Sequence, residues 1–392
     1  MSFRIKLLTV FMFVSCCVMA QGLNSCKTQN SFYTELNYEW VNEKIIIPVE
    51  IEGKMYRFIL DTGAPVIISN GLKNNISSVF LQKLNISDAN NKKGSMVLEK
   101  IPLLEIGGVR YKNVPCLIAN DQTEKLLDCF HAEGFIGSNL LKKSIIQILP
   151  KEKKIKLTDK KRRLSLDKRK SVKMKFPDRQ KTPYFWVHYG GKETANEEIY
   201  LDTGMEGFFD LCRKHFNYFR KHDVFDVVSE GSGSSSIGVF GVEDSTMQYK
   251  VAIPELLIGK TVLRNVTAET TDNANSRIGS RILDYGNITV DYIHGRLYFE
   301  PFENPVDVNE KTFGFDAIYR NGKVIVGIVW DKALKEKIKT GDRILMINEV
   351  DMRNFSLCDY IDFNLKKYEH IKMTVVNTKG KKTELTLDKI YK

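Results

Sequence analysis

The residues best suited to chemistry are two aspartates, each at the head of an Asp-Thr-Gly triplet. Residues 58–69 read FILDTGAPVIIS, and residues 199–209 read IYLDTGMEGFF. An aspartate after three apolar residues leaves a buried strand and enters a tight turn, where the glycine permits backbone geometry that a Cβ would forbid. One triplet is weak evidence, but two in matching settings are strong evidence of a shared role. We therefore expect Asp61 and Asp202 to be the reactive groups.

Two such carboxylates can hydrolyse an amide if folding brings them together. At a separation of about 3 Å they cannot both ionise comfortably, so they share one proton. The charged carboxylate then acts as general base on a trapped water, and the protonated one donates to a carbonyl oxygen. The pKa values belong to the pair rather than to either residue. We expect Thr62 and Thr203 to hydrogen-bond across the pair and hold the turns rigid.

An internal repeat accounts for the presence of two triplets. The segment IPLLEIGGVRYKNVPCLI at 101–118 is echoed by IPELLIGKTVLRNV at 253–266, and FIGSNLL at 135–141 by RIGSRIL at 277–283. Most segments are short, rich in Val, Ile, Phe and Tyr, and punctuated by Gly or Asn, which is typical of β-structure. Two similar β units imply two lobes related by a pseudo-twofold axis, and this axis would bring the triplets face to face.

With these motifs, residues 40–302 resemble retropepsin-type and pepsin-type aspartic proteases. The resemblance implies a mainly β fold of two acid-protease-like barrels, with Asp61 and Asp202 as the catalytic pair of a peptide-bond hydrolase that acts without cofactor or metal. A peptide or protein would be the substrate. The resemblance also implies residues that support the catalytic turns: Thr62, Gly63, Thr203, Gly204, Gly137 and Gly279.

The Gly/Ser-rich segment EGSGSSSIGVFG at 230–241 is similar to a protease flap that closes over substrate. Its glycines would supply the mobility that a lid needs. An ordinary flexible surface loop is the alternative interpretation. The flap candidates are Gly231, Gly233, Gly238 and Gly241.

The chain departs from the resemblance in the residues beside the triplets. Ala64 and Met205 stand where pepsin-like members often carry Ser or Thr, whose hydroxyl bonds the aspartate. Loss of these donors should raise the pKa values of the pair, so we expect a pH optimum nearer neutral than that of pepsin. Arg277 replaces an apolar residue before Ile278. A non-catalytic peptide-binding or scaffold protein that kept a protease fold is the alternative function, and two intact triplets favour catalysis.

The pattern changes near residue 309, and residues 309–392 resemble a PDZ domain, a β/α sandwich. A strand pair turns at Asn321-Gly322, and Gly341-Asp342 matches a second PDZ signature. The resemblance implies a groove that captures the C-terminal peptide of a partner through backbone amides. A groove that is closed, or packed on the protease lobes, is the alternative. The carboxylate-binding loop would be Phe313, Gly314 and Phe315.

Residues 1–20 read as a secretory signal, with a basic start, an apolar stretch and a small-residue cleavage site at Ala20. A lipoprotein signal with Cys16 as the lipidated residue, and hence membrane attachment, is the competing interpretation. Either signal predicts an exported protein, periplasmic or extracellular.

Five cysteines remain after cleavage at residue 20, at wide spacings and with no Cys-x-x-Cys pair or His cluster. This pattern does not suggest zinc. Buried apolar thiols are the plain interpretation, with one disulfide such as Cys116–Cys129 as an option that sequence cannot decide. The five are Cys26, Cys116, Cys129, Cys212 and Cys358.

The net charge of +11 is concentrated in one place. Residues 160–175 hold nine Lys or Arg against one Asp, and most of the remaining chain is nearly neutral, which argues against a general nucleic-acid binder. We interpret this run as a solvated linker, with a processing site or an anionic-surface patch as alternatives. The expected divisions are a signal at 1–20, a first lobe at 21–158, a basic linker at 159–178, a second lobe at 179–303 and the PDZ-like domain at 309–392.

Overall fold

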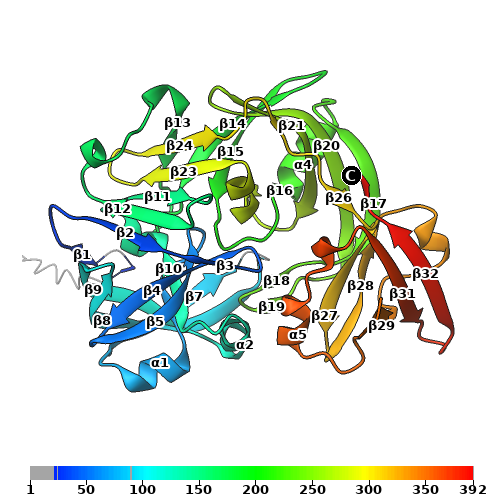
Figure 1. Cartoon of the computed structure of the whole chain (residues 1–392), viewed down its shortest axis with the longest axis horizontal. Helices are drawn as coiled ribbons and strands as arrows, with labels where there is room; N and C mark the ends of the chain where they lie inside the picture. The colour runs from blue at the N-terminus through cyan, green and yellow to red at the C-terminus, as the bar shows by residue number, and fades with distance from the viewer. Residues whose placement is uncertain (1–21, 24, 89–90, 392) are drawn as a thin grey trace, which may run out of the picture.

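The computed structural model describes residues 22–23, 25–88 and 91–391, and the chain forms two β lobes with a smaller β domain beside them (Figure 1). The predicted signal at 1–20 and its Cys16 lie outside the described residues. Within the described part, no helix has the length and apolar character needed to cross a bilayer. The mainly β fold agrees with the alternating and β-branched segments of the sequence.

The first lobe is built on a nine-stranded sheet in the order β1-β9-β6-β10-β5-β4-β8-β7, with β3 on the edge of β4. Its parallel pair β10–β5 sets Gly137 beside Asp61, so the strand register places the first aspartate. The strands are β1 (Lys27–Thr28), β3 (Glu39–Val41), β4 (Lys44–Ile51), β5 (Lys54–Asp61), β6 (Ile67–Ile68), β7 (Val79–Ser87), β8 (Lys93–Ile106), β9 (Val109–Ile118) and β10 (Gly134–Gly137), and the helices are α1 (Asn70–Asn75), α2 (Asp121–Cys129) and α3 (Ser138–Leu141).

The second lobe continues into a fourteen-stranded sheet that also takes three strands from the first half of the chain. These three are β2 (Tyr33–Asn37), β11 (Ile145–Leu149) and β12 (Lys154–Thr158). The second half supplies β13 (Ser171–Lys175), β14 (Tyr184–Gly190), β15 (Ala195–Leu201), β16 (Phe209–Cys212), β17 (Asp226–Gly233), β20 (Thr246–Ile258), β21 (Thr261–Thr271), β22 (Arg277–Ile278), β23 (Gly286–Asp291), β24 (Arg296–Pro301) and β25 (Val306–Asp307). Outside this sheet lie α4 (Arg213–Arg220), the 3₁₀ turn η3 (Ser280–Asp284) and the small hairpin β18 (Ile237–Gly238) and β19 (Gly241–Val242).

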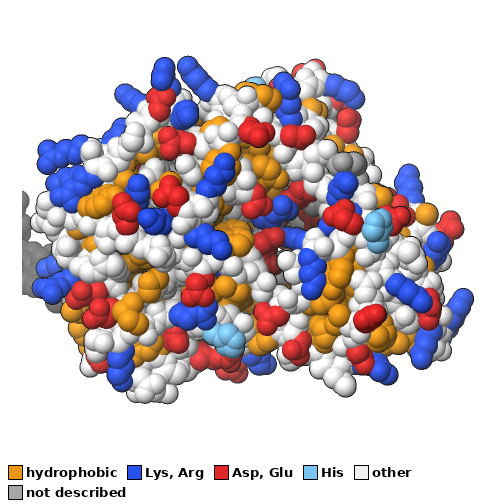
Figure 2. All heavy atoms as spheres, viewed as in Figure 1, with side chains coloured by type: hydrophobic (Ala, Val, Ile, Leu, Met, Phe, Trp, Pro, Cys, Tyr) orange, Lys and Arg blue, Asp and Glu red, His pale blue; other side chains and the backbone are white. Residues whose placement is uncertain are grey.

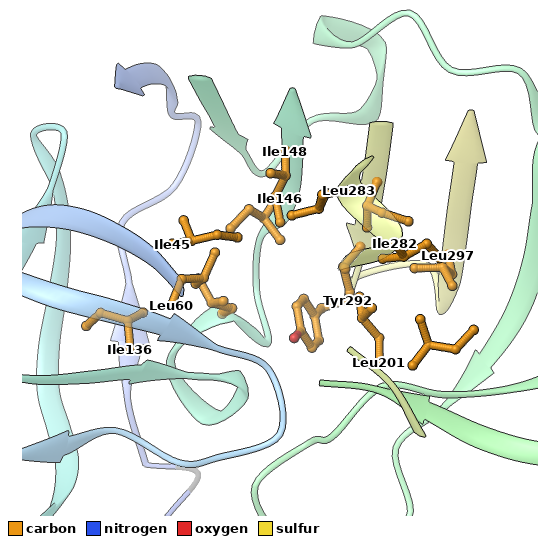
Figure 3. Packing of buried hydrophobic residues seen from close by; sticks show 14 of the residues in the cluster. Ile45, Leu60, Ile136, Ile146, Ile148, Leu201, Ile282, Leu283, Tyr292 and Leu297 are labelled. Carbon is orange, nitrogen blue, oxygen red and sulfur yellow. The ribbon is translucent and has the colours of Figure 1, made fainter. Parts of the chain in front are cut away.

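The strand pairing repeats between the lobes as the sequence repeat predicts. Leu60 pairs with Ile136 in the first lobe, and Leu201 pairs with Ile278 in the second, both in parallel strands. One buried apolar cluster runs through both lobes, and Figure 3 shows Tyr292 between their two sets of residues. The hydroxyl of Tyr292 is 2.6 Å from Ser138 Oγ of the first lobe, so the cross-lobe contact is both apolar and hydrogen-bonded.

The basic segment between the lobes is not a solvated linker throughout. Two short 3₁₀ turns, η1 (Lys161–Arg163) and η2 (Lys168–Lys170), lead into β13, which is hydrogen-bonded to β14 and β24. Met174 points into the core while Lys173 and Lys175 are exposed, the alternation of a half-buried strand. This part of the predicted linker is therefore a sheet strand whose lysines face solvent.

The C-terminal domain has its own core and a six-stranded sheet in the order β27-β28-β29-β31-β32, with β30 on β29. Strand β27 lies at the edge of this sheet, and α5 lies near it. The elements are β26 (Lys311–Thr312), β27 (Phe315–Arg320), β28 (Lys323–Val329), η4 (Leu334–Glu336), β29 (Arg343–Ile347), β30 (Val350–Asp351), α5 (Leu357–Asp362), η5 (Leu365–Lys367), β31 (His370–Val376), β32 (Lys382–Asp388) and β33 (Ile390–Tyr391).

A disulfide joins the C-terminal domain to the first lobe, and its partners differ from the predicted pair. Cys129 at the end of α2 is bonded to Cys358 in α5, with 4.6 Å between their Cα atoms. Cys116 is a free buried thiol in β9, so the Cys116–Cys129 pairing is wrong. The true partners are separated by 229 residues and meet only because α5 faces α2 in the folded chain (Figure 1).

Candidate active site

The turns that follow the two strands are locked to each other by their threonines. The amide of Thr62 donates to Thr203 Oγ1 at 3.0 Å, and the amide of Thr203 donates to Thr62 Oγ1 at the same distance. Each hydroxyl then donates to a carbonyl of the opposite lobe, Leu201 O at 2.7 Å and Leu60 O at 2.8 Å. Because all four bonds are buried and reciprocal, the turns form one rigid unit across the pseudo-twofold axis.

The two carboxylates face each other across this unit. The amide of Gly63 donates to Asp61 Oδ1 at 2.8 Å, and that of Gly204 to Asp202 Oδ1 at 3.1 Å. The charge of Asp202 acts directly on Asp61, so the two carboxyls are electrostatic neighbours. A Cβ at Gly63 would lie 2.5 Å from Asp202 Oδ1, and one at Gly204 would overlap Asp61. Glycine is therefore required in both turns by the close approach of the opposite carboxylate.

Gly137 and Gly279 lie beneath the turns, as the resemblance implies. A Cβ on Gly137 would overlap the backbone at Ala64, and one on Gly279 would lie 2.9 Å from the carbonyl oxygen of Met205. The amide of Ser138 donates to that Ala64 carbonyl at 3.1 Å. The residues after each triplet are thus held by backbone contacts, although both lack a hydroxyl.

A buried arginine makes the second carboxylate different from the first. Arg277 Nη1 is 3.0 Å from Asp202 Oδ2, and its Nη2 is 2.8 Å from Asp210 Oδ2. The arginine is 6% exposed, so both ion pairs lie largely out of water. In the sequence, Arg277 stands out only as a departure from an apolar pattern, and Asp210 is not recognisable as its partner. An arginine in a buried strand, opposite an acidic residue in another, was the available signal.

A lysine approaches the pair from the first lobe. Lys44 Nζ donates to the carbonyl of Gly204 at 2.6 Å and lies 3.1 Å from Glu206 Oε1. The lysine is nearly buried, while the Glu206 side chain is 58% exposed. Lys44 was not predicted to belong to the site, since β4 precedes the first triplet in sequence and meets the second only in space; Glu206, which follows the second triplet, was only a weak acidic candidate in the sequence.

Asp61 and Asp202 have different electrostatic surroundings. Burial and the neighbouring charge of Asp202 raise the pKa of Asp61 to about 7, although Lys44 and the Gly63 amide act in the opposite direction. The guanidinium of Arg277 stabilises the ionised form of the Asp202 carboxylate through their ion pair. Because the raised pKa of Asp61 lies near neutral, its carboxyl can still hold a proton beside Asp202 at that pH.

The predicted flap is anchored at both ends. Gly231 and Gly233 lie on β17, whose end packs on β28 of the C-terminal domain, where the amide of Ser234 donates to Gly327 O at 3.3 Å. Gly238 and Gly241 form the β18–β19 hairpin. The Gly/Ser-rich segment is therefore no free loop, since its base contacts the C-terminal domain.

The tip of this segment meets a hairpin of the first lobe that sequence analysis did not single out. The amide of Phe240 donates to Asp88 Oδ2 at 2.9 Å, and Lys92 Nζ lies 3.1 Å from Asp244 Oδ1. Asp88 directly follows β7, and Lys92 directly precedes β8; this strand pair corresponds to the β17–β20 pair in the repeat. Residues beside two equivalent strand pairs thus contact each other, and Figure 2 shows the molecular face hollowed between the lobes and the C-terminal domain, with charged side chains around the hollow.

The loop predicted to bind a peptide carboxylate has two buried aromatic residues, Phe313 and Phe315, around Gly314. Gly314 has φ +74°, and its carbonyl accepts the amide of Trp330 at 2.8 Å. On the groove side, Tyr360 of α5 donates its hydroxyl to Ala317 O of β27 at 2.8 Å. In the described chain β27 pairs only with β28, so no further strand lies on its outer edge, and Tyr360 bonds the middle of that edge.

A cavity of about 750 Å³ lies where the flap segment, the first lobe and the C-terminal domain meet. Its position at the ends of β27 and β19 places it between the edge strand and the flap. Among its lining residues are Lys125, Val242, Glu243, Tyr319, Arg320 and Leu357.

Comparison with known families agrees with this architecture. Residues 47–140 match the family described as aspartyl protease, and residues 310–376 match the PDZ domain. The first match covers most of the first lobe, including the Asp61 triplet, and the second covers most of the C-terminal domain. No curated protein matches the chain.

Proposed function

We propose that this chain, which carries an aspartyl protease domain and a PDZ domain, is an exported aspartic endopeptidase. The observation that carries the proposal is the pair of reciprocally locked turns that set Asp61 against Asp202. Peptide bonds are the substrate class, because two acids with one shared proton suit hydrolysis of an amide.

Asp202, ionised beside Arg277, serves as the general base. It takes a proton from water while the water oxygen attacks the scissile carbonyl carbon, and Asp61 gives its proton to the carbonyl oxygen. The resulting neutral diol then collapses: the leaving nitrogen takes the proton from Asp202, and a diol hydroxyl returns a proton to Asp61. Both acids end in their starting states, and no covalent intermediate forms.

The pH dependence follows from the separate roles. Asp61 must be protonated, so activity falls as the pH rises through its pKa of about 7. At the acidic end, activity falls because a general base has to be ionised to accept a proton. The optimum therefore lies nearer neutral than that of pepsin, and a rate profile that peaks below about pH 3.5 contradicts this assignment.

Cleavage of a peptide library from pH 3 to pH 8 tests the activity, with Asp61→Asn and Asp202→Asn as controls. We expect cleavage by the wild type and a loss of at least about 10³-fold in either variant, because each removes one half of the acid–base pair. A wild type that cleaves nothing across this range supports the alternative, a non-catalytic peptide-binding or scaffold protein.

We propose that the PDZ domain positions the substrate by its C-terminus. The position of β27 at the edge of its sheet and the cavity between this strand and the flap support this role, and tethering would raise the effective peptide concentration near the acids. In Gly314→Ala the new Cβ would lie 2.8 Å from Asp331 Cβ at a φ of +74°, which distorts the loop. This variant should slow cleavage of peptides with free C-termini more than that of amidated ones, and equal effects would remove the tether.

We propose export because residues 1–20 have the pattern of a secretory signal and because the Cys129–Cys358 disulfide suits an oxidising compartment. Mass spectrometry of the mature N-terminus distinguishes the two signals. Cleavage after Ala20 indicates a released protein, and a lipid-modified Cys16 indicates a membrane-anchored one.

A further inference from the structure

A cluster of three unlike metal-ligand side chains lies in the second lobe, outside the acid pair. Glu197 comes from β15, Cys212 immediately precedes α4, and His215 lies in the first turn of that helix. One carboxylate oxygen, Sγ and a ring nitrogen all lie within 4.8 Å of one another. Glu197 and Cys212 are buried, whereas the His215 side chain is 29% exposed and leaves the cluster a route to solvent.

A second layer of polar groups holds these side chains in place. The hydroxyls of Tyr189 and Ser276 both donate to the Glu197 carboxylate. Ser276 Oγ in turn accepts the amide of Cys212 at 2.8 Å. Such outer hydrogen bonds fix the orientation of metal ligands in proteins.

The first lobe shows that the fold does not require these residue types. By the strand register, Tyr56 occupies the place of Glu197, while Ser69 precedes α1 as Cys212 precedes α4. Ser69 Oγ caps its helix by accepting the amide of Leu72 at 2.9 Å, and Leu72 occupies the place of His215. An aromatic, a hydroxyl and an aliphatic side chain thus serve in one lobe where a carboxylate, a thiol and an imidazole stand in the other.

The ring of His215 already contacts one of the other two side chains. His215 Nδ1 lies against Glu197 Oε1, the same oxygen that accepts the hydroxyl of Ser276. The sulfur, the ring nitrogen and the carboxylate oxygen therefore converge on one point of the lobe, where one cation can contact all three.

We propose that Glu197, Cys212 and His215 form a binding site for a zinc-type divalent cation. Sulfur, imidazole and carboxylate together are a ligand set that zinc prefers, at about 2.0–2.3 Å from the metal, and a water on the exposed side of His215 completes a tetrahedron. Binding releases the proton of His215 and any proton on Cys212, with no redox change. The sequence did not suggest zinc because Glu197 lies on a different element from the Cys-x-x-His pair, and only the fold joins them.

The cation would brace the part of the lobe that positions Asp202. Ser276, which contacts both Glu197 and Cys212, directly precedes Arg277 at the start of β22. The site would thus tie β15, the start of α4 and the approach to β22 into one unit. This role is structural and does not depend on the proposed peptidase activity.

Titration of metal-free protein with Co²⁺ tests the site, because a cobalt–thiolate bond gives a charge-transfer band in the near ultraviolet. We expect a band that saturates at one Co²⁺ per chain and is bleached by Zn²⁺. Cys212→Ser and His215→Ala should abolish the band, and Glu197→Gln should weaken Co²⁺ affinity by about tenfold or more. Cys116→Ser is the matched control, since Cys116 is also a free buried thiol but belongs to no such cluster among the residues that the structure describes, and it should keep the band.

Absence of the band in folded wild-type protein at excess Co²⁺ overturns the proposal and leaves a metal-free hydrogen-bond network, whether or not the variants fold. A band that survives in folded Cys212→Ser overturns it as well. Peptide cleavage is not part of the measurement, so the outcome is independent of whether the acid pair is active.

Discussion

At equivalent positions of the strand register, an apolar pair lies beside Asp61 and a charged pair lies beside Asp202. In the first lobe Phe135 pairs with Ile67 beside the Asp61 turn, and in the second lobe the equivalent pair is Arg277 with Asp210. Arg277 also forms an ion pair with Asp202, whereas Phe135 carries no charge that could act on Asp61. The repeat thus keeps the backbone symmetric, while the side chains give the two acids different charged neighbours.

The carbonyls of the two turns show a second inequality. Gly204 O accepts Lys44 Nζ at 2.6 Å, and Gly63 O accepts the neutral amide Nε2 of Gln180 at 2.7 Å. Each turn is held from outside by one donor, but only one of these donors is charged. Both turn carbonyls therefore have a hydrogen-bond donor. In addition, the positive charge of Lys44 lowers the pKa of Asp61.

Removing the arginine should have the largest effect on this comparison. Arg277→Met leaves the Asp202 and Asp210 carboxylates buried without their cation, which should destabilise the fold by about 3–5 kcal/mol. It should also cut cleavage at neutral pH by about 10²-fold, since Asp202 then competes with Asp61 for the proton. Urea unfolding and the pH–rate profile measure the two effects.

The control transplants the first lobe's pair into the second. Arg277→Phe with Asp210→Ile removes the arginine together with one of its two acids, so stability should recover in part relative to Arg277→Met while the altered pH profile remains. Recovery of the wild-type profile in this double variant would show that the arginine acts only through packing.

Replacing the lysine should have an intermediate effect. Because the positive charge of Lys44 lowers the pKa of Asp61, Lys44→Met should raise that pKa and move the alkaline limb of the rate profile to higher pH. Gln180→Leu removes a donor at the equivalent carbonyl without changing charge, and it should leave the limb in place. Equal shifts in both variants would mean that the hydrogen bond to the turn carbonyl, and not the charge of Lys44, determines the pH of the alkaline limb.

The smallest expected effect is that of Asp61→Asn on the pH dependence of the unfolding free energy. The pKa of Asp61 is raised on folding from 3.8 to about 7, so the folded state binds more protons between these values and loses stability as the pH rises through this window. Asp61→Asn removes this pH-dependent loss. The unfolding free energy of the variant minus that of the wild type should therefore be higher at pH 8 than at pH 3, by at least about 1 kcal/mol. Urea denaturation at both pH values checks it, and a pH-independent difference would contradict the raised pKa.

Much of the site could be predicted because its signals are local. The triplets carry the aspartates, threonines and glycines within three residues, and the repeat implies that two copies meet. The C-terminal domain was predicted from its Gly-Asp and Phe-Gly-Phe motifs in the same way.

What sequence could not supply depends on strand register and on contacts between distant segments. Asp210 meets Arg277 only because β16 pairs with β22 in one register, and a shift of one residue would turn these side chains to the other face. Cys129 and Cys358 are joined across 229 residues by the docking of two domains. The flap segment was recognised by its glycines, but its contacts with Gly327 and Asp88 belong to tertiary packing.

The most direct test is a pH titration of ¹³C-labelled aspartate carboxyls by NMR, with Asp61→Asn and Asp202→Asn used for assignment. The carboxyl signal that disappears in Asp61→Asn should titrate near pH 7 in the wild type, and the one that disappears in Asp202→Asn should already report an ionised group there. A near-neutral titration that belongs to Asp202, or one divided equally between the two acids, would contradict the unequal pair.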